Sequence, residues 1–250
     1  MENLVLEILT HWGLKADKLL EDNLSKSPDF LVEDGEFIHL VELKTREDSA
    51  DRQVQHNNAL DLGKLFTEHM PIVRRNTLSG IVSDASKQLS SKSEYNVDFR
   101  LVWLMPVGMH LEAKVEQIQS SLYGLAGIVD IENTNAFRRK CYFFTDSDFF
   151  RFRHVLDAAV ISWDGNAKLC LNPHSPRYQE FKASGLYSVF GSKACDPIQQ
   201  EKSGAAYIVD SPIDRKNERE VLDYLEKKYK VGNLMRLEVG YTSVSAGIDE

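Results

Sequence analysis

Two carboxylates and a lysine are the residues in this sequence whose types and spacing best suit chemistry. Asp29, Glu42 and Lys44 lie in the segment SPDFLVEDGEFIHLVELKTR, residues 27–46. The runs on either side of its Asp-Gly dipeptide are rich in β-forming residues, and Asp-Gly between two such runs is a strong hairpin signal. We therefore expect these three side chains to project from a two-stranded hairpin.

The alternation of side chains along a strand predicts that the three residues share one face. Glu42 and Lys44 are two positions apart and therefore point the same way. A two-residue Asp-Gly turn would set Asp29 directly across from Leu40 and diagonally across from Glu42. Diagonal neighbours in a hairpin lie about 7–8 Å apart at Cα. Two carboxylates at that separation can share one divalent cation.

This set of groups is typical of a Mg²⁺ site that cleaves phosphodiesters. Mg²⁺ prefers carboxylate oxygens and is often bound by one or two carboxylates together with waters and phosphate. An ammonium group two residues past the second carboxylate can stabilise developing negative charge or orient a water. The strand itself carries apolar residues on both faces, which indicates a central strand. A charged pair there is unfavourable unless it has partners or a metal.

The segment resembles the PD-(D/E)XK motif of the restriction-endonuclease-like nuclease superfamily, with Pro28-Asp29 followed by Glu42-Leu43-Lys44. The resemblance covers about the first 105 residues. It implies an α/β fold with an αβββαβ core and a mixed central sheet. A long insertion, residues 45–77, separates the motif from the second helix of that core.

The resemblance also implies roles for individual residues. Asp29 and Glu42 would bind Mg²⁺, for which Mn²⁺ could substitute, and Glu7 on the first helix would join them as a third metal ligand. Lys44 would position the attacking water. Gln88, in the segment ASKQL, would face the site from the second helix and orient the water or the lysine.

The elements that must position these residues follow from periodicity. Apolar residues at helical spacing predict the helices, and β-rich or continuously apolar runs predict the strands. The expected helices are residues 3–12, 59–70, 77–91 and 111–123. The expected strands are residues 15–21, 30–32, 36–44, 97–105 and 127–131.

The rest of the chain predicts an α+β extension. Strands are expected at 139–144, 158–163, 168–171, 205–209 and 235–239, with a hairpin turn at Asp164-Gly165. Helices are expected at 147–153, from residue 176 and at 214–230. We divide the chain into a nuclease-like core, residues 1–132, and an extension of unassigned role, residues 133–250, with a break near residues 132–138.

Charge and composition narrow the classes of function. The net charge of −8 argues against a protein that coats nucleic acid with its whole surface, but it allows an enzyme with one local basic groove. No apolar run approaches the ~20 residues of a membrane span. The first residues lack the basic and small-residue features of a signal peptide, so we expect a cytoplasmic protein with no membrane partner.

The remaining reactive residue types favour ordinary structural roles. The three cysteines, Cys141, Cys170 and Cys195, are widely spaced and odd in number, which predicts buried free thiols rather than a disulfide framework or a zinc cluster. The histidines show no ligand spacing. Basic residues interleaved with phenylalanines at 138–154 suit contact with nucleic acid, although a Phe-rich stretch is also typical of a core.

Three hypotheses follow from the sequence. The first is a Mg²⁺-dependent nuclease acting on DNA, with RNA left open as a substrate and a homodimer as a compatible state. The second is a catalytically inactive scaffold that binds nucleic acid or protein. The third is an ordinary α/β protein in which the motif is accidental, so that Asp29 lies on the opposite side of the sheet from Glu42 and Lys44.

Overall fold

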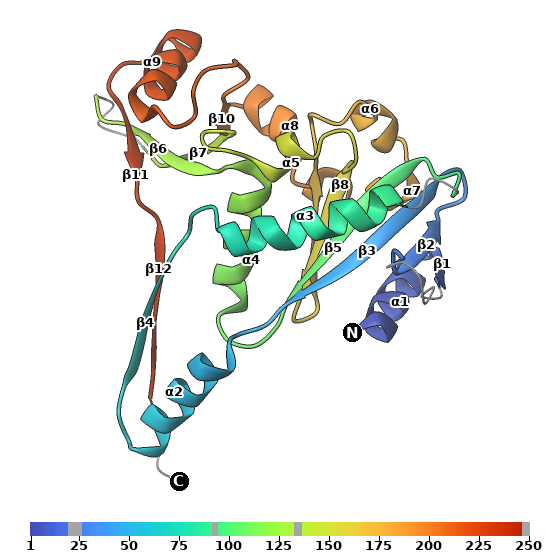
Figure 1. Cartoon of the computed structure of the whole chain (residues 1–250). Coiled ribbons are helices and arrows are strands. Elements are labelled where there is room, and N and C mark those ends of the chain that lie inside the picture. The colour runs from blue at the N-terminus through green and yellow to red at the C-terminus, as the bar shows by residue number, and fades with distance from the viewer. Residues whose placement is uncertain (20–26, 92–94, 133–136, 247–250) are drawn as a thin grey trace.

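Two strands with apolar residues on both faces lie at the centre of the main sheet, as their sequences predict. In the computed structural model, which describes residues 1–19, 27–91, 95–132 and 137–246, they are β3 (Ile38–Arg46) and β5 (Phe99–Pro106). The six-stranded sheet has the order β1-β2-β3-β5-β8-β9 (Figure 1). Its other strands are β1 (Lys15–Lys18), β2 (Phe30–Glu33), β8 (Ala158–Trp163) and β9 (Asn166–Leu171).

The sheet mixes parallel and antiparallel pairing. β1, β2 and β3 form an antiparallel meander. β5 runs parallel to β3, β8 runs parallel to β5, and β9 turns back antiparallel to β8. The chain is therefore a mixed α/β protein, which confirms the predicted class.

Helices cover both faces of this sheet because the strands are apolar on both sides. α3 (Asn76–Ser91) and α4 (Leu111–Tyr123) share an apolar cluster with Leu40 on one face. α1 (Glu2–His11) shares a second cluster with Trp103 on the other face. Figure 1 shows α3 crossing the sheet in front of β3 and β5.

A second sheet of four strands, in the order β10-β7-β6-β11, follows the first. Its strands are β6 (Ala126–Asp130), β7 (Arg139–Tyr142), β10 (Ala206–Ile208) and β11 (Leu234–Leu237). α9 (Glu218–Tyr229) packs against it. Shorter elements complete the body: α5 (Asp148–Arg151), α6 (Tyr178–Phe181), α7 (Gly185–Phe190), the 3-10 turn η1 (Gly191–Lys193) and α8 (Pro197–Lys202).

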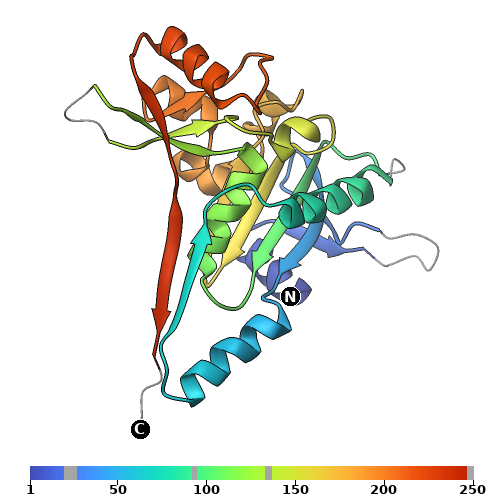
Figure 2. The same ribbon diagram turned by 60° about the vertical axis from the view of Figure 1, so that its left-hand side comes forward.

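An arm projects from the body of the molecule. It consists of α2 (Ala50–Asp61), β4 (Phe66–Pro71) and β12 (Gly240–Ser245), and β4 pairs antiparallel with β12. Figure 2 shows the arm extending away from both sheets. No residue of α2 is buried.

The prediction of a helix at residues 59–70 is wrong. α2 begins at Ala50, where the Ser49 side chain caps it by accepting a hydrogen bond from the Arg52 N–H. It ends before Gly63, which has a φ of +61°. Residues 66–71 form β4 instead, because their backbone groups pair with β12 from the far end of the chain. A local sequence pattern cannot show such a partner.

Other predicted elements agree with the structure to different degrees. Helices α3 and α4 and the hairpin at Asp164-Gly165 are confirmed. The end of the first predicted strand, residues 20 and 21, lies outside the described residues. The helix expected from residue 176 begins only at Tyr178, since the Ser175 side chain is bound to Asp157 and accepts a hydrogen bond from the Arg177 N–H.

The two sheets do not divide at residue 132. β8 and β9 come after that position but belong to the first sheet, whereas β6 comes before it and belongs to the second. Residues 133–136, within the expected break, lie outside the described residues. The insertion at 45–77 holds α2 and β4, which are most of the arm.

The hairpin turn differs from the expected one by one position on each strand. The structure pairs Leu31 with Leu40, and Asp34, the residue after β2, bonds to Phe37, so Gly35 and Glu36 form the turn. Gly35 has a φ of +101°, which favours glycine. The resulting slip of two residues keeps every side chain on its predicted face. Continuing the register sets Asp29 opposite Glu42 rather than opposite Leu40.

The Asp34 side chain explains this turn. Its Oδ1 accepts a hydrogen bond from the Phe37 N–H at 3.0 Å, and its Oδ2 accepts one from the Leu186 N–H at 3.1 Å. The buried His39 places Nε2 2.6 Å from the same Oδ2. Burial alone would raise the pKa of Asp34, but these hydrogen bonds, with that of His39 the largest, more than offset it and lower the pKa.

We expect Asp34→Ala to destabilise the protein by roughly 2–3 kcal/mol, because three donors lose a charged acceptor. Urea unfolding at neutral pH measures this. Asp17→Ala, which removes an exposed aspartate from β1 of the same sheet, should change stability by less than about 0.5 kcal/mol. Equal stabilities of the two variants would contradict the role given to Asp34.

Candidate active site

The second half of β3 continues past the start of β2 and leaves one edge of β3 without a strand partner among the described residues. β2 pairs with residues 38–41 of β3, whereas β5 on the other side pairs with residues 39–46. The Asp29 carboxylate takes the place of the missing partner, since its Oδ2 accepts a hydrogen bond from the Leu43 N–H at 2.6 Å. Asp29 is thereby fixed where the two strands separate.

The structure brings Asp29, Glu42, Lys44 and Gln88 together. Glu42 and Lys44 project on the α3 side of the sheet, the same side as Leu40. Lys44 Nζ lies 2.5 Å from Glu42 Oε1 and donates a hydrogen bond to Gln88 Oε1, also at 2.5 Å. Asp29 interacts with both Glu42 and Lys44. The arrangement in which Asp29 faces away from the other two is therefore not the one observed.

Glu42 is the most unusual residue of the group, because it is a carboxylate that is only 1% exposed. Its Oε1 is paired with Lys44, but its Oε2 is buried and has no hydrogen-bond partner. Burial raises the pKa of Glu42 to about 7, the hydrogen bond from Lys44 opposes this, and the negative charge of Asp29 adds to it. At neutral pH the Glu42 carboxyl is therefore about half protonated, and one of its two oxygens has no hydrogen-bond partner in the structure.

Asp29 is affected in the same direction. Burial raises its pKa, while the hydrogen bond from Leu43 and the charge of Lys44 lower it in part. The charge of Glu2, at the start of α1, also raises it. Two carboxyl groups with raised pKa values, side by side, are typical of a functional site.

Hollows flank Lys44 on both sides. One, of about 560 Å³, is lined by Asp29, Lys44 and residues from the start of α1, including Glu2, and by Glu47 past the end of β3. The other, of about 390 Å³, is lined by Gln88 and its neighbours on α3. Lys44 and Ile81 line both hollows. A solvent-borne substrate can therefore reach the ammonium group.

The structure does not bring Glu7 to the site. Val5 and Leu9 form the buried face of α1, and Glu7 lies about 200° around the helix from each, so it is exposed to solvent. Glu2 lies beside Asp29 instead, although it also forms an ion pair with Lys18. The helix expected at residues 3–12 did not include Glu2, whereas α1 begins at that residue.

The donor set fits a hard divalent cation held by two carboxylates. Asp29 and Glu42 supply oxygen ligands, and the unpartnered Oε2 of Glu42 is the observation that favours a cation there. Within the described ranges, no group of three or more His, Cys, Asp or Glu side chains is arranged to hold a metal. The remaining ligands of such an ion would be waters and substrate oxygens.

The raised pKa of Glu42 predicts how the stability of the protein depends on pH. Its folded-state pKa of about 7 lies above the ordinary value of 4.5, so the folded protein binds this proton more tightly than the unfolded chain. Stability should fall as the pH rises from about 4.5 to about 7 and stay lower above that range. In the presence of a chelator, we expect Glu42→Gln to be more stable than wild type by roughly 1–3 kcal/mol at pH 8.

Urea unfolding at pH 5 and pH 8 measures the difference, which should nearly vanish at pH 5. Glu36→Gln alters an exposed glutamate in the same hairpin and should leave stability unchanged at both values. If Glu42→Gln and wild type differ equally at pH 5 and pH 8, Glu42 is not the titrating group.

The cysteines and most of the phenylalanines considered in the sequence belong to the protein core. The three cysteines are free and buried, as expected. Phe143, Phe144 and Phe149 lie in the core, which favours the structural interpretation of that stretch. Phe150 is exposed and has the guanidinium group of Arg153 over its ring.

None of the helices in the described part of the chain combines the length and apolar character that a membrane span requires. Comparison with protein-family models, with curated proteins and with solved structures finds no match for this chain.

Proposed function

We propose that this protein is a Mg²⁺-dependent nuclease that hydrolyses phosphodiester bonds in DNA. The observation that carries the proposal is the buried Glu42 carboxylate, whose Oε2 has no partner and which lies next to Asp29 and in contact with Lys44. A buried carboxylate oxygen without a partner is unfavourable in a folded protein, and carboxyl groups with raised pKa values gather at functional sites.

Each side chain has a role in this proposal. Asp29 and Glu42 hold Mg²⁺, with Mn²⁺ able to substitute. When bound, the ion would polarise a phosphoryl oxygen and lower the pKa of a coordinated water. Lys44, partly exposed between the two hollows, donates hydrogen bonds to the attacking water or to the phosphate as negative charge develops. Gln88 holds Lys44 in place through its Oε1.

The order of elements supports membership of the PD-(D/E)XK superfamily. An α-helix, a three-stranded antiparallel meander, a second helix and a strand parallel to the third strand follow one another as α1, β1, β2, β3, α3 and β5. This order agrees with the αβββαβ core that the motif implies. The arm elements α2 and β4 are inserted between β3 and α3. A role in defence or in repair is compatible with this assignment.

One observation favours the inactive scaffold as a second candidate. Glu42 and Gln88 both engage Lys44, and the described residues contain no group of three or more His, Cys, Asp or Glu side chains arranged to hold a metal. A Mn²⁺ titration separates the candidates. The nuclease requires Mn²⁺ binding that Glu42→Ala weakens, whereas a scaffold would bind no Mn²⁺ or would bind it equally in the variant.

The proposed activity is tested by offering the purified protein a panel of substrates with Mg²⁺, with Mn²⁺ and with a chelator. The panel contains linear, nicked and branched duplex DNA, single-stranded DNA and RNA. We expect cleavage of at least one DNA form with either metal and none with the chelator. Absence of cleavage across the whole panel would refute the enzymatic proposal.

A further inference from the structure

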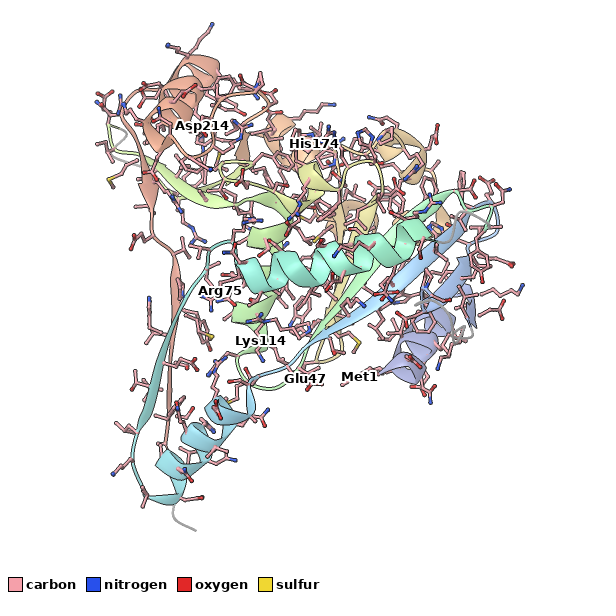
Figure 3. The ribbon with its side chains drawn as sticks, viewed as in Figure 1. Met1, Glu47, Arg75, Lys114, His174 and Asp214 are labelled. Atoms are coloured by element: carbon pink, nitrogen blue, oxygen red, sulfur yellow. The ribbon has the colours of Figure 1, made fainter. Side chains whose placement is uncertain are left out.

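Four cationic side chains converge where β3 ends and the arm joins the body. Arg46 comes from β3, Arg52 from α2, Arg75 from the residue before α3, and Lys114 from α4. Their charges act on one another, since Arg46 interacts with Arg75 and Arg52, and Lys114 interacts with Arg52 and Arg46. Figure 3 labels Arg75 at the start of α3 and Lys114 on α4, both on the side of the body nearest the arm.

Two acidic side chains, Asp48 and Glu68, pair with two of these four cations. Asp48 is buried, and its Oδ1 accepts a hydrogen bond from Arg52 Nη1 at 2.9 Å and lies 2.8 Å from Lys114 Nζ. Arg52 Nη2 also pairs with Glu68 at 2.5 Å. Arg52 and Lys114 therefore have carboxylate partners.

Arg46 and Arg75 have no carboxylate partner within the described residues. Arg46 donates from Nη1 to Thr77 Oγ1 at 3.3 Å, and its Nε is buried without a hydrogen-bond partner. Arg75 uses its backbone N–H to bind Ser121 Oγ, but its guanidinium group takes part in no hydrogen bond or ion pair of the described structure. Both arginines are only partly exposed.

Two neighbouring guanidinium groups without a bound carboxylate repel each other, and burial strengthens the repulsion. The charge of Asp48 attracts Arg46 and offsets this repulsion only in part, because the Asp48 carboxylate is bound to Arg52 and Lys114. The chain has 38 acidic residues against 30 basic ones, so a carboxylate partner could readily have been provided. The planar guanidinium group binds phosphate through two parallel hydrogen bonds, which makes it well suited to an external phosphate.

The cluster lies close to the candidate active site. Arg46 follows Lys44 by two positions on the same strand and therefore projects from the same face of the sheet. Their Cα atoms are about 6.6 Å apart at the usual rise of a strand. That spacing is comparable with the distance between neighbouring phosphates of a nucleic-acid strand.

We propose that Arg46 and Arg75 bind a backbone phosphate of the nucleic acid on the arm side of the phosphate that is cut. This inference rests on the proposed nuclease function and adds a binding site to it. It explains how a chain with a net charge of −8 holds a polyanion, because the contact is confined to one local cluster. The arm then lies beside the bound strand, since Arg52 of α2 pairs with Asp48, which also binds Lys114 of the body.

Fluorescence anisotropy with a short labelled DNA duplex, its single strand and the matching RNA duplex tests the inference, with Ca²⁺ replacing Mg²⁺ to prevent cleavage. Arg46→Ala and Arg75→Ala should each weaken binding of the preferred nucleic acid by about 3–10-fold. Each should also reduce the slope of log affinity against log salt concentration by about 0.9 on duplex DNA, or about 0.7 on a single strand.

Arg219→Ala is the matched control, because Arg219 pairs with Asp223 on the exposed face of α9 and should leave affinity and slope unchanged. Arg75→Ala removes a guanidinium group without partners, so it tests the inference even if Arg46→Ala fails to fold. Wild-type affinity and slope in a folded Arg75→Ala protein would overturn the inference. Cleavage by that same protein would leave the proposed function standing, whereas a wild-type protein that neither binds nor cuts any nucleic acid would refute both.

Discussion

Lys44→Ala is expected to lower metal-dependent DNA cleavage by about 10²–10³-fold while Mn²⁺ still binds. Lys44 Nζ lies 2.5 Å from Glu42 Oε1 and is held by Gln88, so its ammonium group has a fixed position beside the carboxylates. Removing it takes away a donor aimed at developing charge but leaves both carboxylate ligands in place. Single-turnover cleavage and Mn²⁺ titration measure the two quantities separately.

Lys15→Ala serves as the control for this variant. Lys15 also lies on a strand of the main sheet and also pairs with a glutamate, Glu33, at 3.0 Å, but on the exposed strand β1. Its removal should change cleavage by less than about twofold, since an exposed ion pair contributes little. If Lys44→Ala cleaves at the wild-type rate, Lys44 has no part in the chemistry.

Asp48→Ala is expected to destabilise the protein by about 3–5 kcal/mol. The Asp48 carboxylate binds Arg52, Lys114 and the Met109 N–H, the last at 2.7 Å. The Lys114 side chain is 2% exposed, and without Asp48 its buried ammonium group keeps only the Val107 carbonyl oxygen as an acceptor. Urea unfolding at neutral pH measures the loss.

A double variant separates charge from packing. Asp48→Ala combined with Lys114→Met removes both buried charges and should be less destabilised than Asp48→Ala alone. Asp223→Ala removes an exposed aspartate that pairs with Arg219 at 2.8 Å and should change stability by less than about 0.5 kcal/mol. A loss below about 1 kcal/mol in Asp48→Ala would contradict the role of Asp48 as the anchor of this cluster.

The parts of the fold that sequence predicts well are those whose partners are near in the chain. Helices α3 and α4 follow from their own periodicity, and the Asp164-Gly165 hairpin follows from its turn. The shared face of Glu42 and Lys44 follows from alternation along one strand. It is unchanged by the observed register, because that register differs from the expected one by an even number of residues.

The parts that sequence misses depend on distant partners. β4 exists because β12 pairs with it, and the hairpin register is set by Asp34, which Leu186 also binds. Lys114 resembles a surface residue in its helix, yet it is buried and pairs with Asp48, which lies two residues past the end of β3. Glu7 was expected at the site because the resemblance places a glutamate on the first helix, but the orientation of α1 brings Glu2 there.

The central claim is that Asp29 and Glu42 together hold a divalent cation. Anomalous diffraction from a crystal of the protein soaked in Mn²⁺ tests it most directly. The account predicts a peak about 2.1 Å from a carboxylate oxygen of Asp29 and from Oε2 of Glu42, and no peak in crystals of Glu42→Ala. A Mn²⁺ ion bound elsewhere, or one that remains in the Glu42→Ala crystal, would contradict it.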